Sequence, residues 1–215
     1  MIGETDIEVT VLENEIEKAK GQVEAWMTSY RKNRWENQDY YVEVFIEKKA
    51  LQGIFQQPCA RAQVALGACK GYPSLTFLND TAKRFKAAYE QDKLLRIIYF
   101  GDHDPSGDDI PNSIANNLQR FGIEVQIDRV ALNRDQVIEW KLPAAPIKDG
   151  DSRSKNFTGI GQVELDAIEP KKLQSMCRDA IDKYFDDDLY TQLKEEQEEE
   201  KVTFVAELKK FVQTL

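Results

Sequence analysis

The stretch that decides the fold of this sequence runs from Leu94 to Gly107 and reads LLRIIYFGDHDPSG. Its first seven residues are mainly apolar, have the length of a β-strand and end abruptly at Gly101. Asp102 and Asp104 follow, and because residues i and i+2 of an extended chain point to the same side, their carboxylates can face the same point. Such a pair suits Mg²⁺, which takes one or two protein carboxylates and completes its shell with water and phosphate oxygens.

Two other interpretations of these aspartates are a calcium-binding loop and a solvent-exposed turn. The segment from Asp102 to Gly107 matches the start of an EF-hand loop, but Ser113 stands where that loop needs a bidentate Glu. The residues before it also resemble a strand rather than the helix of an EF-hand. Asp-x-Asp-Pro is common in solvated turns as well, so the local sequence leaves that alternative open.

A second strand-like run ends in an acidic residue. Val42, Val44 and Ile46 alternate with other residues, and Glu47 follows immediately, before a segment with helical character. Ligands of open α/β sheets bind at the carboxyl ends of the strands. We therefore expect Glu47 to converge with Asp102 and Asp104, although they are far apart in the sequence.

The rest of the pattern predicts an α/β fold. Strand-like segments cover residues 41–47, 62–68, 94–101 and 123–132. Helical patterns separate them, which predicts a mostly parallel four-stranded sheet with helices on both faces. Ser106 and Asp109 predict a capping box at the start of a helix over 106–121.

We divide the chain into three parts on the basis of these patterns. Residues 1–40 form an N-terminal helical arm and residues 41–140 the α/β core. Residues 141–215 form a loop at the active edge and C-terminal helices that we expect to pack on the core. A long loop inside a compact domain is often functional.

Charge and composition narrow the classes of function. The net charge is −9, but residues 1–18 carry −5 and residues 186–200 carry −7, so a nucleic-acid-binding core remains possible. No run approaches the ~20 apolar residues that cross a bilayer, and no signal peptide is evident, so we expect a cytoplasmic protein without a membrane partner. Three cysteines without metal-ligand spacing indicate reduced structural thiols.

Glu47 at the end of one strand and GDHDPSG at 101–107 after another together resemble the signature of the Toprim domain. The resemblance extends over residues 30–185, through KGYPSL at 70–75 and VELDA at 163–167. It is greatest to the topoisomerase VI A subunit, its meiotic double-strand-break relatives and phage and bacterial proteins of that branch. The resemblance implies a Toprim, Rossmann-like core and Mg²⁺-dependent action on DNA phosphodiester bonds, with Mn²⁺ as a possible substitute.

The resemblance also assigns candidate residues. Glu47, Asp102 and Asp104 would be the catalytic metal ligands, with Glu164 and Asp166 as further ligands. Candidates for contact with nucleic acid or phosphate are Lys48, Lys70, Ser74, Lys148 and Arg153. Ser74 is equally explained as an ordinary helix cap. His103 points away from the face that the two aspartates share, so we expect it to pack rather than to act as a base.

The sequence does not decide between two classes of function, DNA cleavage and binding without catalysis. Topoisomerases of this branch cleave DNA with a tyrosine on a preceding winged-helix domain. We expect residues 1–40 to be too few for such a domain, unless the chain is a fragment of a longer protein. Tyr30, Tyr40 and Tyr41 are the nearest tyrosines, and their surroundings predict packing. We therefore expect either a nicking nuclease or topoisomerase-like cleavage with a partner that supplies the winged helix and nucleophilic tyrosine. The alternative is a non-catalytic, metal- and nucleic-acid-binding regulatory module of a phage or mobile element.

Overall fold

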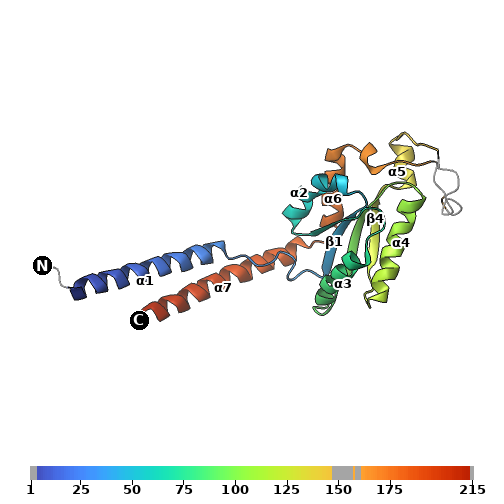
Figure 1. Ribbon diagram of the computed structural model, residues 1–215. Helices are drawn as coiled ribbons and strands as arrows, with labels where there is room; N and C mark the ends of the chain where they lie inside the picture. The colour runs from blue at the N-terminus through green and yellow to red at the C-terminus, as the bar shows by residue number, and fades with distance from the viewer. Residues whose placement is uncertain (1–3, 147–156, 158–160, 214–215) are drawn as a thin grey trace. The chain divides into compact units, whose positions relative to one another are not determined.

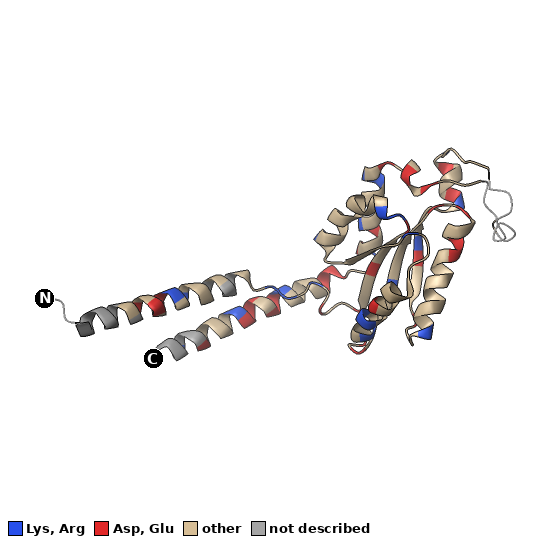
Figure 2. Cartoon of the chain, viewed as in Figure 1, with Lys and Arg blue, Asp and Glu red and all other residues tan. Residues whose placement is uncertain are grey.

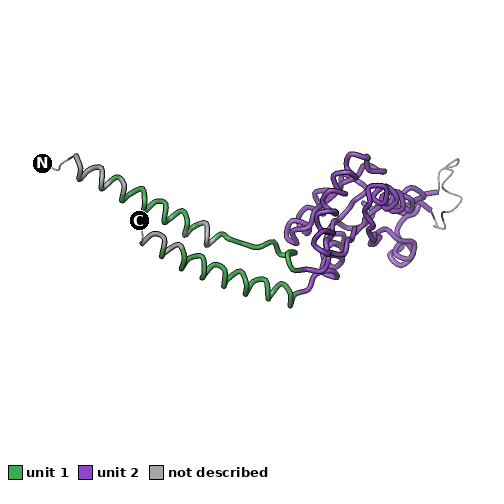
Figure 3. Tube along the Cα trace, turned by 90° about the horizontal axis from the view of Figure 1, so that it is seen from below, with its two compact units in different colours: residues 1–37, 187–215 green, residues 38–186 purple. Residues whose placement is uncertain are grey.

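The computed structural model describes residues 4–146, 157 and 161–213. The chain forms two compact units (Figure 3). One unit, which we call the core unit, comprises residues 38–186, and the other, the helical unit, comprises residues 1–37 and 187–215. This division differs from the expected boundaries at 40 and 140, because the last helix belongs to the same unit as the first.

The core unit alternates strands and helices (Figure 1). In chain order it contains β1 (Tyr40–Ile46), η1 (Lys49–Leu51), α2 (Gln52–Ala62), β2 (Ala65–Ala68), α3 (Leu75–Tyr89), β3 (Leu94–Phe100), α4 (Pro105–Arg120), β4 (Gln126–Ala131), α5 (Arg134–Glu139), η3 (Leu165–Ala167) and α6 (Pro170–Asp182). The four strands pair in the order β2-β1-β3-β4, and every pairing is parallel. The expected α/β class and four-stranded parallel sheet are thus confirmed.

Alternation along the central strands gives the sheet two buried faces. Phe45 and Tyr99 belong to a fully buried cluster with the apolar sides of α3 and α4. Phe100 points to the other face, where its ring lies 4.7 Å from that of Phe55 on α2. Helices therefore cover both faces, as the sequence predicts, and the carboxyl ends of β1 and β3 are held between these layers.

The observed elements differ from the predicted ones in the second and fourth strands and in one additional helix. The fourth strand covers Gln126–Ala131 rather than residues 123–132. The second strand begins at Ala65 rather than at Ala62, because α2 continues to Ala62 and ends at Gln63 in the left-handed conformation, with φ of 56°. The short helix α5 was not predicted. It begins with a capping box between Asn133 and Gln136, and its single turn and a half carries too little apolar periodicity to show in the sequence.

The side chain of Gln38 ties the two ends of the core unit together. Its Nε2 donates to the carbonyl of Asp186 at 3.0 Å, and its Oε1 accepts from the amide of Asp186 at 2.6 Å. Gln38 is buried, so both bonds are shielded from water. The chain thus enters and leaves this unit at one point.

The helical unit contains α1 (Glu4–Ser29) and α7 (Asp187–Gln213). The two helices run antiparallel, because Asn37 bonds to Leu189 whereas the earlier Tyr30 bonds to the later Glu200. None of the helices in the described part of the chain combines the length and apolar composition needed to span a lipid bilayer.

Candidate metal and phosphate site

Glu47 and Asp102 meet at the carboxyl ends of neighbouring strands. Ile46 of β1 is in register with Phe100 of β3, and the amide of Glu47 donates to the carbonyl of Phe100 at 2.9 Å. One step further, the amide of Asp102 donates to Oε2 of Glu47 at 2.9 Å. The acidic ends of the two strands are therefore joined directly.

Two glycines of the motif are required by close approach. A Cβ on Gly107 would lie 2.0 Å from the carbonyl oxygen of Asp102 and 3.3 Å from Oε2 of Glu47. A Cβ on Gly101 would lie 2.7 Å from the same Oε2 and 2.6 Å from the ring of Tyr99. A side chain at position 101 would push the carboxylate of Glu47 away from Asp102, and one at position 107 would displace the carbonyl of Asp102.

Asp102 is held from two sides. Its Oδ1 accepts from the amide of Leu165 at 2.7 Å, and its Oδ2 lies 3.3 Å from Nζ of Lys48. Leu165 reaches this place because residues 103 and 163 exchange two backbone hydrogen bonds, at 2.8 and 3.0 Å. The segment around η3 is thereby brought to the edge of β3.

Lys48 lies among three carboxylates. Besides Asp102, its Nζ is 2.9 Å from Oε2 of Glu164 and 3.8 Å from Oδ2 of Asp166. Burial lowers the pKa of Lys48, but Glu164, Asp102 and Asp166 outweigh it, so the net shift is upward. Lys48 thus links Asp102 to Glu164 and Asp166, and the expected role of these two acids as further metal ligands stays a prediction.

Asp104 caps helix α4. Its Oδ1 accepts from the amide of Gly107 at 2.6 Å, and Pro105 occupies the first turn. The predicted capping box of Ser106 and Asp109 is wrong, because the helix begins one residue earlier and Asp109 instead accepts from the hydroxyl of Tyr72 at 2.6 Å. The positive end of the α4 dipole consequently lies at the acidic edge.

Arg129 is the residue that sequence reasoning missed. Its guanidinium, on β4, donates to the carbonyls of Asp102 at 2.7 Å and Leu132 at 2.9 Å. It also donates to the carbonyl of Gly107 and pairs with Asp108 at 2.8 Å. The only signal in the sequence is a single arginine inside a strand-like segment, between Asp128 and Val130.

Two carboxyl groups at this edge have raised pKa values. Burial, together with the charges of Asp102 and Asp104, raises the pKa of Glu47 to about 7, although the amide of Asp102 acts in the opposite direction. Burial also raises the pKa of Asp102. A positive ion near these groups would stabilise their charged forms.

The donor chemistry fits a hard cation, but the arrangement does not form a finished metal cluster. Across residues 4–146, 157 and 161–213, no three His, Cys, Asp or Glu side chains are placed together to hold a metal ion. The positive charge beside Asp102, Glu164 and Asp166 is the ammonium of Lys48. Oxygen-only donors around such a charge are the chemistry that Mg²⁺ requires.

The remaining candidates have mixed placements. Lys70 is exposed and forms an antiparallel bridge with Lys48, so both lie at this edge. The hydroxyl of Ser74 accepts from the amide of Phe77 at 3.2 Å, which makes it a cap of α3. Lys148 and Arg153 lie outside the described residues.

His103 is a packed side chain rather than a member of the acidic edge. It is 3% exposed, and its ring centroid lies 4.9 Å from that of Phe157. Burial lowers its pKa, so the neutral imidazole is favoured. This placement agrees with the packing role expected from its position between the two aspartates.

Comparison with known proteins does not identify a family for this chain. No protein-family model matches the sequence, and no curated protein or solved structure matches the chain.

Proposed function

We propose that this chain is a Toprim-like domain that acts on DNA phosphodiester bonds with the help of Mg²⁺ or Mn²⁺. The observation that carries the proposal is the 2.9 Å hydrogen bond from the amide of Asp102 to Glu47, which joins the acidic ends of β1 and β3. The carboxyl edge of a parallel sheet is where α/β proteins bind ligands. Glu47, Asp102, Lys48 and the N-terminus of α4, which Asp104 caps, lie at that edge.

Glu47, Asp102 and Asp104 would hold the metal, and Glu164 and Asp166, which lie near Lys48, would contribute through water. The bound ion would neutralise charge on the phosphate and lower the pKa of a coordinated water. Within the chain, Arg129 fixes the backbone of Asp102, and the exposed Lys70, which is bridged to Lys48, would offer positive charge to a phosphate at the same edge.

Tyr40 and Tyr41 do not suit a covalent mechanism. Both lie at the start of β1, at the opposite end of the strand from Glu47. The Tyr40 ring packs 5.0 Å from that of Tyr184, and the Tyr41 hydroxyl donates to Glu43 at 3.0 Å. Cleavage would therefore use metal-bound water, or a nucleophilic tyrosine on the winged helix of a partner protein.

The ammonium of Lys48 favours a second candidate function. Because Lys48 already neutralises Asp102 and Glu164, the edge can be stable without metal, as in a non-catalytic module that binds nucleic acid and regulates a phage or mobile element. Such a module would bind DNA without changing it.

Incubation of supercoiled plasmid with the purified protein tests the proposal. We expect nicked product with Mg²⁺ or Mn²⁺, none with EDTA, and none with Asp102→Asn. DNA binding with metal but no nicking by the wild type would refute cleavage by this chain alone and would support either the regulatory module or cleavage by a partner's tyrosine. Nicking retained in Asp102→Asn would show a contaminating nuclease and refute the site.

A further inference from the structure

The helical unit exposes apolar side chains along α7. Val202 and Phe204 are 71% and 45% exposed, respectively. A long helix in water is stabilised mainly by burying its apolar side against other elements. Two antiparallel helices bury only the sides that face each other, so an exposed apolar side chain such as Phe204 indicates a surface that a third helix can cover. Val202, two residues earlier, points to a different side of α7.

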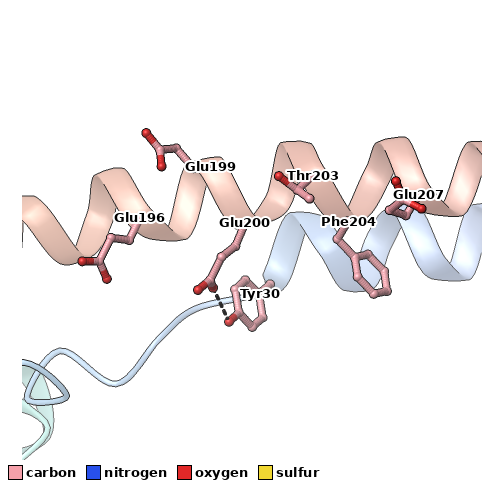
Figure 4. A pocket seen from close by; sticks show the side chains of 7 residues that line it. All are labelled: Tyr30, Glu196, Glu199, Glu200, Thr203, Phe204 and Glu207. Atoms are coloured by element: carbon pink, nitrogen blue, oxygen red, sulfur yellow. Dashed lines mark hydrogen bonds between the residues drawn. The ribbon is translucent and has the colours of Figure 1, made fainter.

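One part of this surface is a groove of about 640 Å³. Its apolar walls include Tyr30 and Phe204, whose rings point to the same side of α7 (Figure 4). Its acidic lining comprises Glu196, Glu199, Glu200 and Glu207. An apolar strip with acidic edges is the complement of an amphipathic helix with basic flanks.

The charges around the groove are only partly compensated inside the unit. Glu200 accepts from Tyr30 at 3.0 Å and pairs with Lys32 at 2.7 Å, and Lys32 also lies 3.6 Å from Glu196. Glu199 has no hydrogen bond or ion pair among the residues that the structure describes. Glu207 pairs with Lys210 at 2.7 Å.

The net charge decides which helix the groove suits. The helical unit has 16 acidic and 9 basic residues, so it carries −7 of the total −9, and acidic residues recur along α7 (Figure 2). A second copy of the chain would bring another unit of −7 against the first. A basic helix would gain from the same charges that disfavour the second copy.

We propose that the groove binds an amphipathic helix of a partner protein whose apolar stripe is flanked by Lys and Arg. The stripe contacts Tyr30 and Phe204, and the basic flanks face Glu196, Glu199 and Glu207. This binding site is independent of the acidic edge of the core unit, and its test does not depend on metal or DNA.

Fluorescence anisotropy with two labelled synthetic helices tests the proposal on the full chain. The helices share one Leu stripe and differ only in having Lys or Glu at every flanking position. Phe204→Ser and Glu199→Lys alter the groove. Val202→Ser and Glu195→Lys are matched controls on α7 that do not line it, and circular dichroism verifies that all variants keep their helix content.

We expect the Lys helix to bind and the Glu helix not to bind. Phe204→Ser and Glu199→Lys should each weaken binding by about tenfold or more, and the controls by less than about threefold. Equal losses in Glu199→Lys and Glu195→Lys, with none in Phe204→Ser, would show attraction to net charge alone and overturn the proposal. Sedimentation that shows a dimer abolished by Phe204→Ser would also overturn it, because the occupant would then be a second copy.

Discussion

Oε2 of Glu47 accepts a 2.9 Å hydrogen bond from the backbone amide of Asp102, so the side chain that ends β1 holds the backbone that ends β3. The hydroxyl of Tyr99 donates to the same oxygen at 3.3 Å. This contact makes the position of the Asp102 carboxylate depend on Glu47, and it places two acidic groups together in a partly dehydrated site. The physical consequences are measurable without knowing the substrate.

The first prediction concerns pH and the stability of the metal-free protein. Folding raises the pKa of Glu47 to about 7, so between about pH 4.5 and 7 the folded state holds the proton and the unfolded state has lost it. The free energy of unfolding therefore falls as pH rises through this window. Glu47→Gln cannot ionise and should be more stable than the wild type by about 1–3 kcal/mol at pH 8.

Urea denaturation in EDTA at pH 5 and pH 8 measures this effect, with Glu90→Gln on the exposed surface as the control. If the free energy of unfolding falls equally in the wild type and in Glu47→Gln between pH 5 and pH 8, burial does not raise the pKa of Glu47.

Gly107→Ala should be strongly destabilising. Its Cβ would lie 2.0 Å from the carbonyl oxygen of Asp102, which is backbone and cannot rotate away, so we expect a loss of about 3 kcal/mol or more. Gly53→Ala is the matched control in helix α2, where a Cβ meets no atom within 4 Å, and it should be neutral or stabilising by about 0.5–1 kcal/mol. Chemical denaturation measures the free energy of unfolding of both variants. Equal values would show that residues 101–107 are not tightly packed.

Arg129→Met should loosen the motif without removing a carboxylate. The variant loses donors to the carbonyls of Asp102 and Leu132, which we expect to cost about 2–4 kcal/mol. Arg120→Met, on the exposed end of α4, is the control and should change stability by less than about 0.5 kcal/mol. A thermal shift no larger than that of the control would refute a structural role for Arg129.

Lys48→Met should make the acidic edge dependent on divalent metal. Without the ammonium, Asp102 and Glu164 lose their positive partner, so stability in EDTA should fall by about 1–3 kcal/mol. Millimolar Mg²⁺ should restore much of that loss in Lys48→Met and change Lys49→Met little. If Mg²⁺ stabilises both variants equally, the ion does not replace the positive charge of Lys48 beside Asp102 and Glu164.

The sequence predicted the fold well where periodicity is strong. Alternation in Val42, Val44 and Ile46 and the apolar run before Gly101 located β1 and β3 to within a residue. It failed at Ala62, because an apolar run before a strand looks the same whether it is helical or extended. Tertiary contacts and the left-handed Gln63 decide that boundary, and neither is visible in a pattern of apolar residues.

The sequence predicted which acidic residues lie together in the candidate site, but it did not predict the contacts of Arg129 and Lys48. Strand ends with acidic residues indicated that Glu47 and Asp102 would lie together, since parallel strands end at the same edge. Arg129 could not be found in this way, because its guanidinium acts on backbone carbonyls that no sequence pattern reveals. The contacts of Lys48 depend likewise on the path of the chain from residue 161 to Leu165, which brings Glu164 to the edge.

Binding of Mn²⁺ tests the central claim most directly, and electron paramagnetic resonance can count free Mn²⁺ in a titration of the pure protein. We predict saturable binding by the wild type that Mg²⁺ displaces and that Asp102→Asn with Asp104→Asn abolishes, while circular dichroism shows the fold retained. Equal Mn²⁺ affinity in the wild type and the double variant would contradict a metal site at the carboxyl edge of β1 and β3.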